Sequence, residues 1–259
     1  MYKEGLSSKG SVIGLHSLFY DEIDSTNDEA KRLVSKSNPI EGTVIYSNNQ
    51  WLGRGQIDSH WQSEGGKNII LSFIIYPEFL KIERNFDLNI WISTSIVAAL
   101  STYCDRVQIK WPNDIYIGEK KIGGILIENS IRGQLLANSI VGIGLNINQT
   151  DFEGLPRATS LAIETQRSYN LNTLTEELLA TLDKTYLSIR YGVSFKEAYL
   201  NHLLGNGTDR LFRDRRTDQI IRGMIQGIDP QGRLMIFNQT GVSYFWMKEI
   251  EFLFDVDSD

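Results

Sequence analysis

The stretch VQIKWPNDIYIGEKKIGGILIENSIRGQLLANSIVGIGL, residues 107–145, decides the fold. It holds apolar runs separated by short polar or glycine-containing connections. Connections this short join strands that run antiparallel, whereas parallel strands need a crossover of about a dozen residues or more. We therefore predict four consecutive strands in an antiparallel meander, at residues 107–111, 114–117, 121–129 and 135–144.

The chain before the meander is predicted to alternate between strands and helices. Ser25 or Thr26 can cap a helix, because a hydroxyl oxygen accepts a backbone N–H of the first turn. The run NIILSFIIY is too short to span a membrane and suits a central strand. The expected strands are residues 11–20, 44–47 and 68–76, and the expected helices are residues 27–35 and 88–103.

The chain after the meander is predicted to form two helices and then a second, smaller unit. The helices are expected at residues 172–190 and 195–203. Beyond Gly205, short β-like runs separated by turn residues suit a small β-barrel of about 50 residues. The sequence thus predicts an α+β fold, with a mixed, largely antiparallel sheet flanked by helices in residues 1–205 and a small barrel in residues 206–259.

Composition excludes several classes of function. The net charge of −6 gives no general attraction to nucleic acid or to anionic membranes. The single cysteine, Cys104, cannot form an intrachain disulfide, and the three scattered histidines argue against structural zinc. The amino terminus lacks the apolar core of a signal peptide, and no apolar run reaches the roughly 18 residues of a membrane helix. We therefore expect a cytoplasmic protein.

A glycine-rich stretch at residues 50–67 is the first candidate for chemistry. Gly53 and Gly55 let backbone N–H groups approach a ligand closely, and Arg54 can reach carboxylate or phosphate oxygens with a planar fork. The alternative is a flexible surface loop with an incidental arginine. The stretch is not a P-loop, because GxxxxGK is absent, and it is not a dinucleotide fingerprint, because GxGxxG fails at Asp58.

Two further candidates come from the meander. In KWPND, residues 110–114, a buried carboxylate at Asp114 could accept from a ligand hydroxyl or hold a basic group in place, and the alternative is a plain hairpin turn. In KKIGGILIE, residues 120–128, glycines inside a strand often mark close approach by a ligand. Lys121 would point a cation into that space, and the alternative is a solvated lysine at a strand end.

The last two candidates are a glycine pair and a strand-to-helix junction. Gly142 and Gly144 alternate on one face of a strand and leave a flat wall for a ring-shaped ligand. The alternative is packing against a bulky neighbour. The junction at residues 24–27 offers small polar groups for a polar ligand head, and the alternative is ordinary helix capping.

Taken in order, these motifs closely resemble the biotin–protein ligase family over roughly residues 15–165, with a weaker match at residues 223–234. That family carries, in this order, an STN junction, a GRG loop followed by tryptophan, a KWPND turn, a KxxGIL strand and a GxGxN strand. Here they stand at residues 25–27, 53–55 with Trp61, 110–114, 121–126 and 142–146. The resemblance implies that the small barrel is SH3-like.

The resemblance also implies residue roles. The implied catalytic residues are Arg54, Lys121 and Asp114. Biotin would be bound by Ser25, Thr26, Asn27, Gln50, Gly53, Arg54, Gly55, Gln56, Lys121, Gly124, Gly142 and Gly144. ATP or the adenylate would be bound by Arg54, Trp61, Asn113, Lys121, Asn146 and Asn148.

The implied reaction activates biotin with ATP, accompanied by Mg²⁺, and attaches it to a lysine of a biotin carboxyl carrier protein or domain. Arg54 and Lys121 would offset the repulsion between the biotin carboxylate and the α-phosphate. The glycine loop would then shield the mixed anhydride from water. No metal site made by the protein alone is expected, and the family allows a monomer or a homodimer.

The sequence departs from the family pattern at two places. Gln56 stands where arginine is common, so we hypothesise weaker retention of the adenylate unless another cation compensates. Only about 20 residues precede Asp24, which leaves no room for the helix-turn-helix domain that some members carry. We therefore expect no DNA binding and no membrane association.

Two other functions compete with this one. A lipoate ligase or octanoyltransferase has a similar fold, but the polar residues 25–27 and the GRG loop favour a ureido ring over a fatty chain. A biotin sensor without ligase activity is disfavoured because Arg54, Lys121 and Asp114 are all present.

Overall fold

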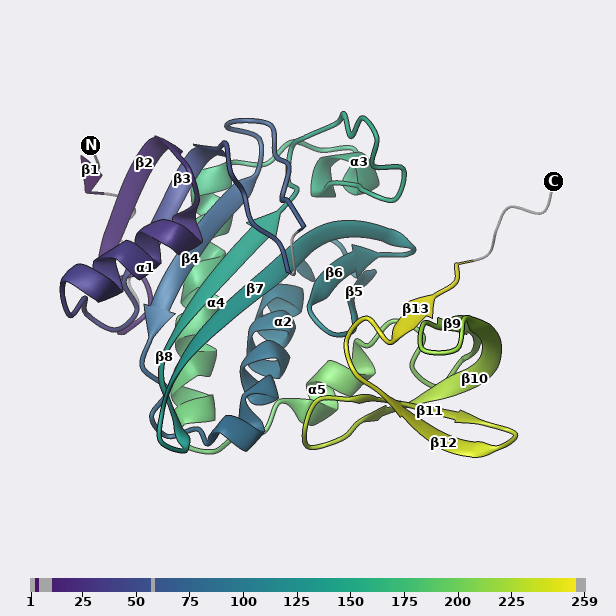
Figure 1. Ribbon diagram of the computed structural model, residues 1–259. Helices are drawn as coiled ribbons and strands as arrows, with labels where there is room; N and C mark the ends of the chain where they lie inside the picture. Colours follow the sequence, from purple (N-terminus) through teal and green to yellow (C-terminus); the bar gives the residue numbers. More distant parts are fainter. Residues whose placement is uncertain (1–2, 5–10, 57–58, 255–259) are drawn as a thin grey trace.

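The protein is described by a computed structural model that covers residues 3–4, 11–56 and 59–254 (Figure 1). Its larger sheet has eight strands in the order β1-β2-β3-β4-β8-β7-β6-β5. The predicted meander is confirmed: β5 to β8 pair antiparallel in sequence order. These strands are β5 (Val107–Lys110), β6 (Asp114–Ile117), β7 (Lys120–Arg132) and β8 (Leu135–Leu145).

The other half of the larger sheet contains its one parallel pair, β2 with β3. These two strands are joined through a helix, α1, that crosses over between them, as a parallel connection requires. The central strand β4 pairs antiparallel with β3 and with β8. The elements are β1 (Lys3–Glu4), β2 (Ser17–Ile23), α1 (Thr26–Lys36), β3 (Val44–Gln50) and β4 (Ile69–Ile75).

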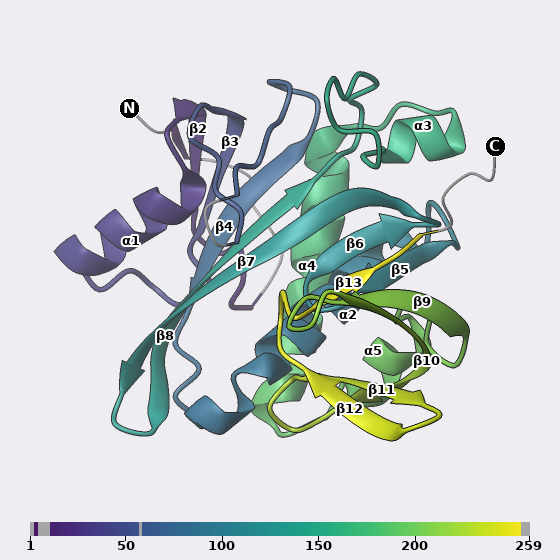
Figure 2. The same ribbon diagram turned by 45° about the vertical axis from the view of Figure 1, so that its right-hand side comes forward.

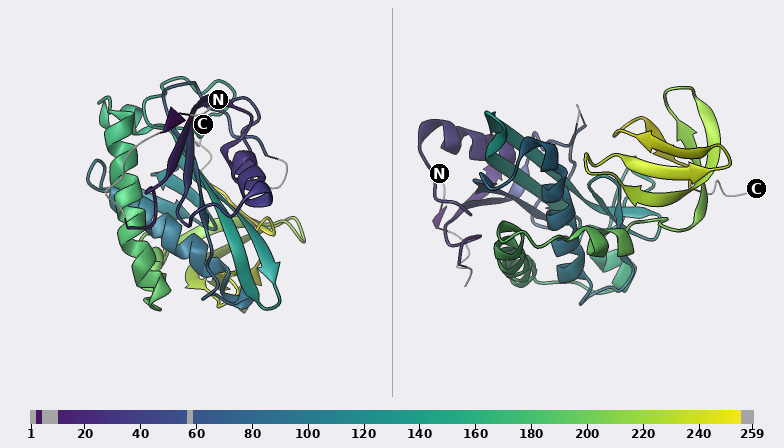
Figure 3. Two further views of the ribbon diagram at one scale, coloured as in Figure 1. Left: turned by 90° about the vertical axis from the view of Figure 1, so that its left-hand side faces the viewer. Right: turned by 90° about the horizontal axis from the view of Figure 1, so that it is seen from below.

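Helices cover both faces of the larger sheet (Figure 3). Helix α1 packs on β3, β4 and β8 from one side, while α2 (Phe86–Leu100) packs on the other side against α4 (Leu171–Arg190) and α5 (Lys196–Asn201). Every residue of β4 is buried, and α2 is buried nearly all round because it lies between the sheet and α4. The aromatic contacts of Trp91 with Phe73 and Tyr186 join these layers.

The first predicted strand was placed too early. Residues 11–16 form turns and bends, and the strand begins at Ser17. The reason is local: the backbone N–H groups of Ser11, Val12 and Ile13 donate to the Asp183 carboxylate at 2.7–2.8 Å, so they are not available to a neighbouring strand. The short helix α3 (Leu161–Thr165) and the 3₁₀ turn Ile82–Arg84 were not predicted.

A second, five-stranded antiparallel sheet follows, in the order β12-β11-β10-β9-β13. It lies beside β5 and β6, at the end of the larger sheet opposite β1 and β2 (Figure 2). Its strands are β9 (Asp209–Asp214), β10 (Gln219–Ile228), β11 (Leu234–Asn238), β12 (Gly241–Phe245) and β13 (Ile250–Phe252).

Specific contacts attach the second sheet to the KWPND turn. The indole Nε1 of Trp111 donates to the carbonyl oxygen of Gly232 at 2.9 Å, between two buried groups. The rings of Tyr116 and Phe254 stack with centroids 6.0 Å apart. The position of this turn therefore depends on both sheets.

Among the described residues, no helix combines the length and apolar character needed to cross a membrane.

We predict that Trp111→Phe lowers the free energy of unfolding by about 1–3 kcal/mol, because it leaves the buried Gly232 carbonyl without its donor. Urea unfolding followed by circular dichroism measures the loss. The matched control is Trp51→Phe, at an indole that is 60% exposed, which should change stability by less than about 0.5 kcal/mol. Equal stability of the two variants would contradict the role of this hydrogen bond.

Candidate active site

A cavity of about 360 Å³ lies at the carboxyl end of β3, and its floor is formed by β7 and β8. This volume is within the range of small-molecule sites. Most of the residues predicted from sequence line it: Ser25, Thr26, Asn27, Gln50, Arg54, Gly55, Gln56, Trp61, Asn113, Asp114, Lys121, Gly124, Gly142 and Gly144. Gly53, Asn146 and Asn148 are not among its lining residues.

One end of the cavity is a buried network of small polar side chains. Gln50 Oε1 accepts from the backbone N–H of Thr26 at 2.7 Å and from its hydroxyl at 3.0 Å. Ser72 Oγ donates to Asn27 Oδ1 at 2.6 Å. Ser25 caps α1, since its side chain accepts from the N–H of Asp28. The junction therefore caps a helix and also presents polar groups to the cavity.

The two glycines of β8 make room for side chains of the protein itself. A Cβ atom at Gly142 would lie 2.3 Å from Asn27 Oδ1, and one at Gly144 would lie 2.5 Å from Cε2 of the Trp61 indole. Both glycines therefore pack against side chains of the protein and also line the cavity, and their contact with a ligand stays a prediction. The Trp61 Nε1 atom is buried and has no hydrogen-bond partner within the described chain, so it remains a free donor.

The GRG loop is an ordered hairpin in its described part. Trp61 N–H donates to the Gly53 carbonyl at 2.9 Å, and Gly55 N–H donates to the Ser59 carbonyl at 2.7 Å. A Cβ atom at Gly53 would lie 2.4 Å from the Trp61 carbonyl oxygen, so this close approach requires glycine. The hairpin fixes the direction in which Arg54 leaves the backbone.

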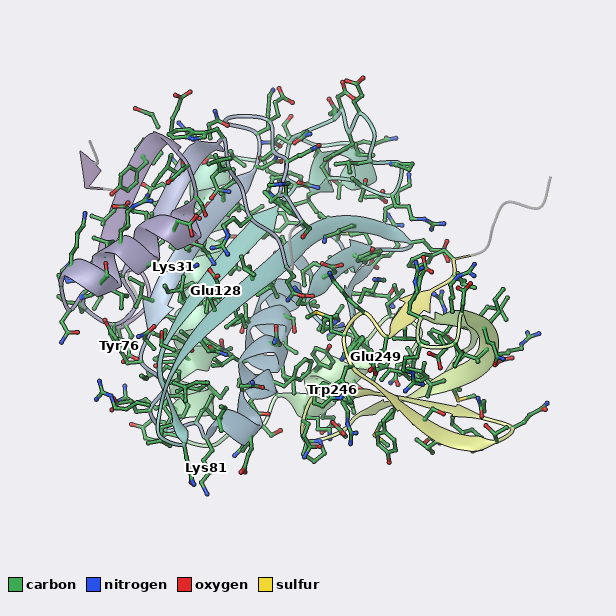
Figure 4. All side chains as sticks on the ribbon, viewed as in Figure 1. Lys31, Tyr76, Lys81, Glu128, Trp246 and Glu249 are labelled. Atoms are coloured by element: carbon green, nitrogen blue, oxygen red, sulfur yellow. The ribbon has the colours of Figure 1, made fainter. Side chains whose placement is uncertain are left out.

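Arg54 is held by two carboxylates, one from α1 and one from β7. Its guanidinium nitrogens lie 2.7 Å from Asp28 Oδ1 and 3.1 Å from Glu128 Oε1. Lys31 pairs with the same Glu128 at 2.8 Å, and the two labelled side chains lie side by side in Figure 4. Sequence reasoning assigned no role to Asp28 or Glu128, because neither was recognisable as a partner of Arg54 before the fold placed them together.

Glu128 is ionised at neutral pH. Burial by itself would raise the pKa of this carboxyl group, but hydrogen bonds from Lys31 and Asn27 and the charges of Lys31 and Arg54 outweigh it, so the pKa lies below its usual value. Arg54 therefore faces full negative charge, and an anionic ligand that binds it must compete with that charge.

Lys121 and Asp114 form an ion pair inside the cavity, with Nζ and Oδ1 2.6 Å apart. The register of β6 with β7 places Asp114 opposite Gly124, and a Cβ atom at Gly124 would lie 3.5 Å from both Lys121 Nζ and Asp114 Oδ1. The same ammonium lies 5.8 Å from the centroid of the Trp61 ring. Asp114 thus pairs with Lys121, whose side chain is 35% exposed, and the ligand roles of both residues stay predictions.

The asparagines predicted to lie near the adenylate differ in what they bind. Asn148 pairs both atoms of its amide with the backbone of Tyr169, and Asn113 donates to the carbonyl of Ile125. Asn146 donates to the Thr159 carbonyl at 3.1 Å, but its Oδ1 is buried and unpaired within the described chain. Asn146 therefore keeps an acceptor for a ligand, and the adenylate roles of all three remain predictions.

Residues that sequence reasoning missed close the other end of the cavity. Ile250 and Phe252 come from β13, Met247 and Lys248 come from the connection between β12 and β13, and Lys110 comes from β5. The KWPND motif drew attention to Lys110, but no sequence signal linked it to a strand more than a hundred residues further on.

A family model described as the Biotin/lipoate A/B protein ligase family matches residues 19–146. The bifunctional ligase/repressor BirA of Bacillus spizizenii is 30% identical over 94% of this chain and 76% of its own length. A biotin–[acetyl-CoA-carboxylase] ligase of Paracoccus denitrificans is 26% identical over 84% of this chain and 92% of its own. A biotin protein ligase of Aquifex aeolicus, solved in complex with biotin and ATP, superposes with a TM-score of 0.75 and 26% identity over 91% of this chain and 97% of its own.

The fold and the cavity with its GRG hairpin and paired cations are those of a protein ligase that works on a small carboxylic acid. The chain belongs to the biotin/lipoate A/B protein ligase family, and within it to the biotin–protein ligases.

We predict that Glu128→Gln loosens the GRG hairpin. The ion pairs are partly exposed, so the loss should not exceed about 1 kcal/mol, which corresponds to a rate of trypsin cleavage after Arg54 up to about fivefold faster. Timed proteolysis with mass spectrometry measures this rate. Glu83→Gln, at an exposed carboxylate in the 3₁₀ turn, is the control and should leave the rate unchanged. Equal rates for both variants would show that Glu128 does not hold Arg54.

Proposed function

We propose that this enzyme converts biotin and ATP to biotinyl-5′-AMP and transfers the biotinyl group to a lysine of a biotin carboxyl carrier domain. The observation that carries the proposal is one cavity with a polar end at the buried Thr26 and the half-buried Gln50 and with Lys121 on its floor. A ureido ring needs hydrogen-bond partners, whereas a fatty chain does not. An ammonium group is a suitable partner for the carboxylate at the other end of biotin.

In the first step, a carboxylate oxygen of biotin attacks the α-phosphorus of ATP. The bond from that phosphorus to the bridging oxygen breaks, and pyrophosphate leaves with the electron pair. Arg54 and Lys121 offset the repulsion between the two anions in this step. For Arg54, this requires exchange of the Asp28 and Glu128 carboxylates for ligand oxygens.

In the second step, the amine of the carrier lysine attacks the acyl carbon of the mixed anhydride, and AMP leaves. Asp114, held beside Lys121, is positioned to orient the adenylate and the incoming lysine. The biotin-binding and adenylate-binding residues are proposed to be those predicted from sequence, including Gly53, Asn146 and Asn148, which do not line the cavity. The division into a catalytic unit of residues 1–205 and a carboxyl-terminal unit of residues 206–259 is also proposed.

Mg²⁺ is proposed to enter with ATP. Asp114 is the one carboxylate among the described lining residues, and no cluster of three metal-binding side chains occurs in the described chain. This donor set fits Mg²⁺, which proteins commonly hold through one or two carboxylates and the substrate phosphates. Asp114 would contribute the protein oxygen, and the ion would neutralise phosphate charge.

The proposed macromolecular partner is the carrier domain of a biotin-dependent carboxylase. The Paracoccus relative is named for acetyl-CoA carboxylase, which supports this class of partner. The expected absence of DNA binding stays a prediction, and a salt-sensitive, sequence-specific DNA shift with the purified protein would overturn it. The protein is proposed to be a monomer or a homodimer.

We predict that the protein, incubated with MgATP and a biotin carboxyl carrier domain, adds one biotinyl group with biotin and no lipoyl group with lipoate. Lys121→Ala should reduce the rate at least about 100-fold, because it removes a charge partner of the transition state. Intact-mass spectrometry of the carrier measures both results. Lys120→Ala, at the adjacent exposed lysine, is the control and should retain activity.

Lipoyl transfer in this assay would favour the lipoate ligase alternative. Tight biotin binding without any transfer would favour the sensor. Wild-type activity in Lys121→Ala would contradict the assignment of Lys121 but not the reaction.

We predict that Gln56→Arg lengthens the half-life of the enzyme-bound adenylate. Gln56 lines the cavity together with Arg54, so the added cation would join Arg54 in binding the proposed adenylate phosphate. One charge-assisted hydrogen bond corresponds to about tenfold in dissociation rate. Release of radiolabelled biotinyl-5′-AMP from the isolated complex measures it. An unchanged half-life would show that the glutamine does not limit retention.

A further inference from the structure

Lys110 is a cation in the cavity to which no role has been assigned. It is the last residue of β5 and lines the cavity together with Phe252 of β13. Its ammonium nitrogen lies 5.5 Å from the centroid of the Tyr116 ring and 5.1 Å from that of the Phe252 ring. The second sheet therefore encloses this lysine from one side.

Lys110 differs from Arg54 and Lys121 in having no carboxylate in contact within the described chain. Lys121 lies 2.6 Å from Asp114, and Arg54 lies 2.7 Å from Asp28. Within the described chain, the Lys110 ammonium makes no ion pair and no hydrogen bond, only the two contacts with aromatic rings. Ring faces attract a cation but replace only part of its lost hydration.

The electrostatic environment of Lys110 favours the binding of an anion. Burial lowers the pKa of its ammonium group, Asp114 and Glu251 act in the opposite direction from a distance, and the charge of Lys121 lowers it further. An enclosed cation beside a second cation is unfavourable until a group of negative charge binds between them.

The position of Lys110 in the sheet indicates which anionic group binds beside it. Gln50 of the polar end lies on β3, whereas Lys110 lies on β5, and β4, β8, β7 and β6 separate these two strands. Lys121, on the intervening strand β7, lies between the two ends. In an in-line displacement at phosphorus, the leaving group departs on the side opposite the attacking oxygen. With the biotin ring at the polar end, the leaving group therefore points toward β5.

We propose that Lys110 is a further catalytic residue, which binds the pyrophosphate leaving group of the adenylation step. The inference rests on the proposed function. The biotin carboxylate forms a bond to the α-phosphorus, the bond to the bridging oxygen breaks, and that oxygen keeps the electron pair. Lys110 donates hydrogen bonds to the departing oxygens and keeps its proton. The second step involves no pyrophosphate and does not use Lys110.

The test is Lys110→Met, which keeps the length of the side chain and its packing against Tyr116 and Phe252 but removes the charge. Because it removes a cation without a partner, the variant should fold with an unfolding temperature at or above that of the wild type. We expect the rate of adenylate formation to fall about 100-fold. We expect transfer from supplied biotinyl-5′-AMP to the carrier lysine to change by less than about twofold.

The reverse reaction gives a readout that general damage to the site would not mimic. With bound biotinyl-5′-AMP and inorganic pyrophosphate as the probe, Lys110→Met should raise the half-saturating pyrophosphate concentration about tenfold or more. Lys110→Arg should recover part of this loss because it restores the positive charge. Lys120→Met, at an exposed lysine of β7, is the matched control and should behave as the wild type.

The outcomes separate the two proposals. If the wild type forms no biotinyl-5′-AMP, the proposed function itself fails. If the wild type does form it, but Lys110→Met has the same pyrophosphate dependence as Lys120→Met, the assignment of Lys110 is wrong. Equal losses in the adenylation and transfer steps would also overturn it, since they would indicate a general structural role.

Discussion

The site depends on the two glycines of β8, Gly142 and Gly144, which have no side chain where other parts of the protein approach the sheet. A Cβ atom at Gly142 would meet Asn27 of α1, and one at Gly144 would meet the Trp61 ring. Without these close approaches, neither the start of α1 nor the GRG hairpin could lie against the sheet. Gly124, on β7, lies beside the ion pair of Lys121 with Asp114. The glycine floor thus brings the polar end and the cations into one cavity.

Arg54, Lys121 and Lys110 line the same cavity but differ in their contacts. Arg54 and Lys121 are held by carboxylates, which keeps them ordered and makes a ligand compete for them. Among the described residues, Lys110 is held by two aromatic rings and by no carboxylate. In the proposed reaction, negative charge moves from the biotin carboxylate to the pyrophosphate leaving group. Arg54 and Lys121, which have carboxylate partners, position the reacting groups, and Lys110 stabilises the pyrophosphate as it leaves.

The second sheet contributes to the site as well as to stability. Trp111 donates to Gly232, Tyr116 stacks on Phe254, and Phe252 closes the cavity over Lys110. All three contacts fall on β5, β6 or the turn between them, so the carboxyl-terminal strands determine where the KWPND turn stands. This arrangement explains why an active site made mostly by the larger sheet includes residues of the smaller one.

The sequence by itself determined the meander, the helices that flank it and a set of site residues most of which line the cavity, because short connections, periodicity and ordered motifs are local properties. It did not determine that the first long strand begins only at Ser17, because the N–H groups of residues 11–13 bind Asp183, a residue far along the chain. Only the tertiary structure decided that Asp28 and Glu128 hold Arg54, while Lys110 contacts two aromatic rings and no carboxylate in the part of the chain that the structure describes. The physical reason is that the balance of charge around a side chain depends on which distant carboxylates and rings the fold places beside it.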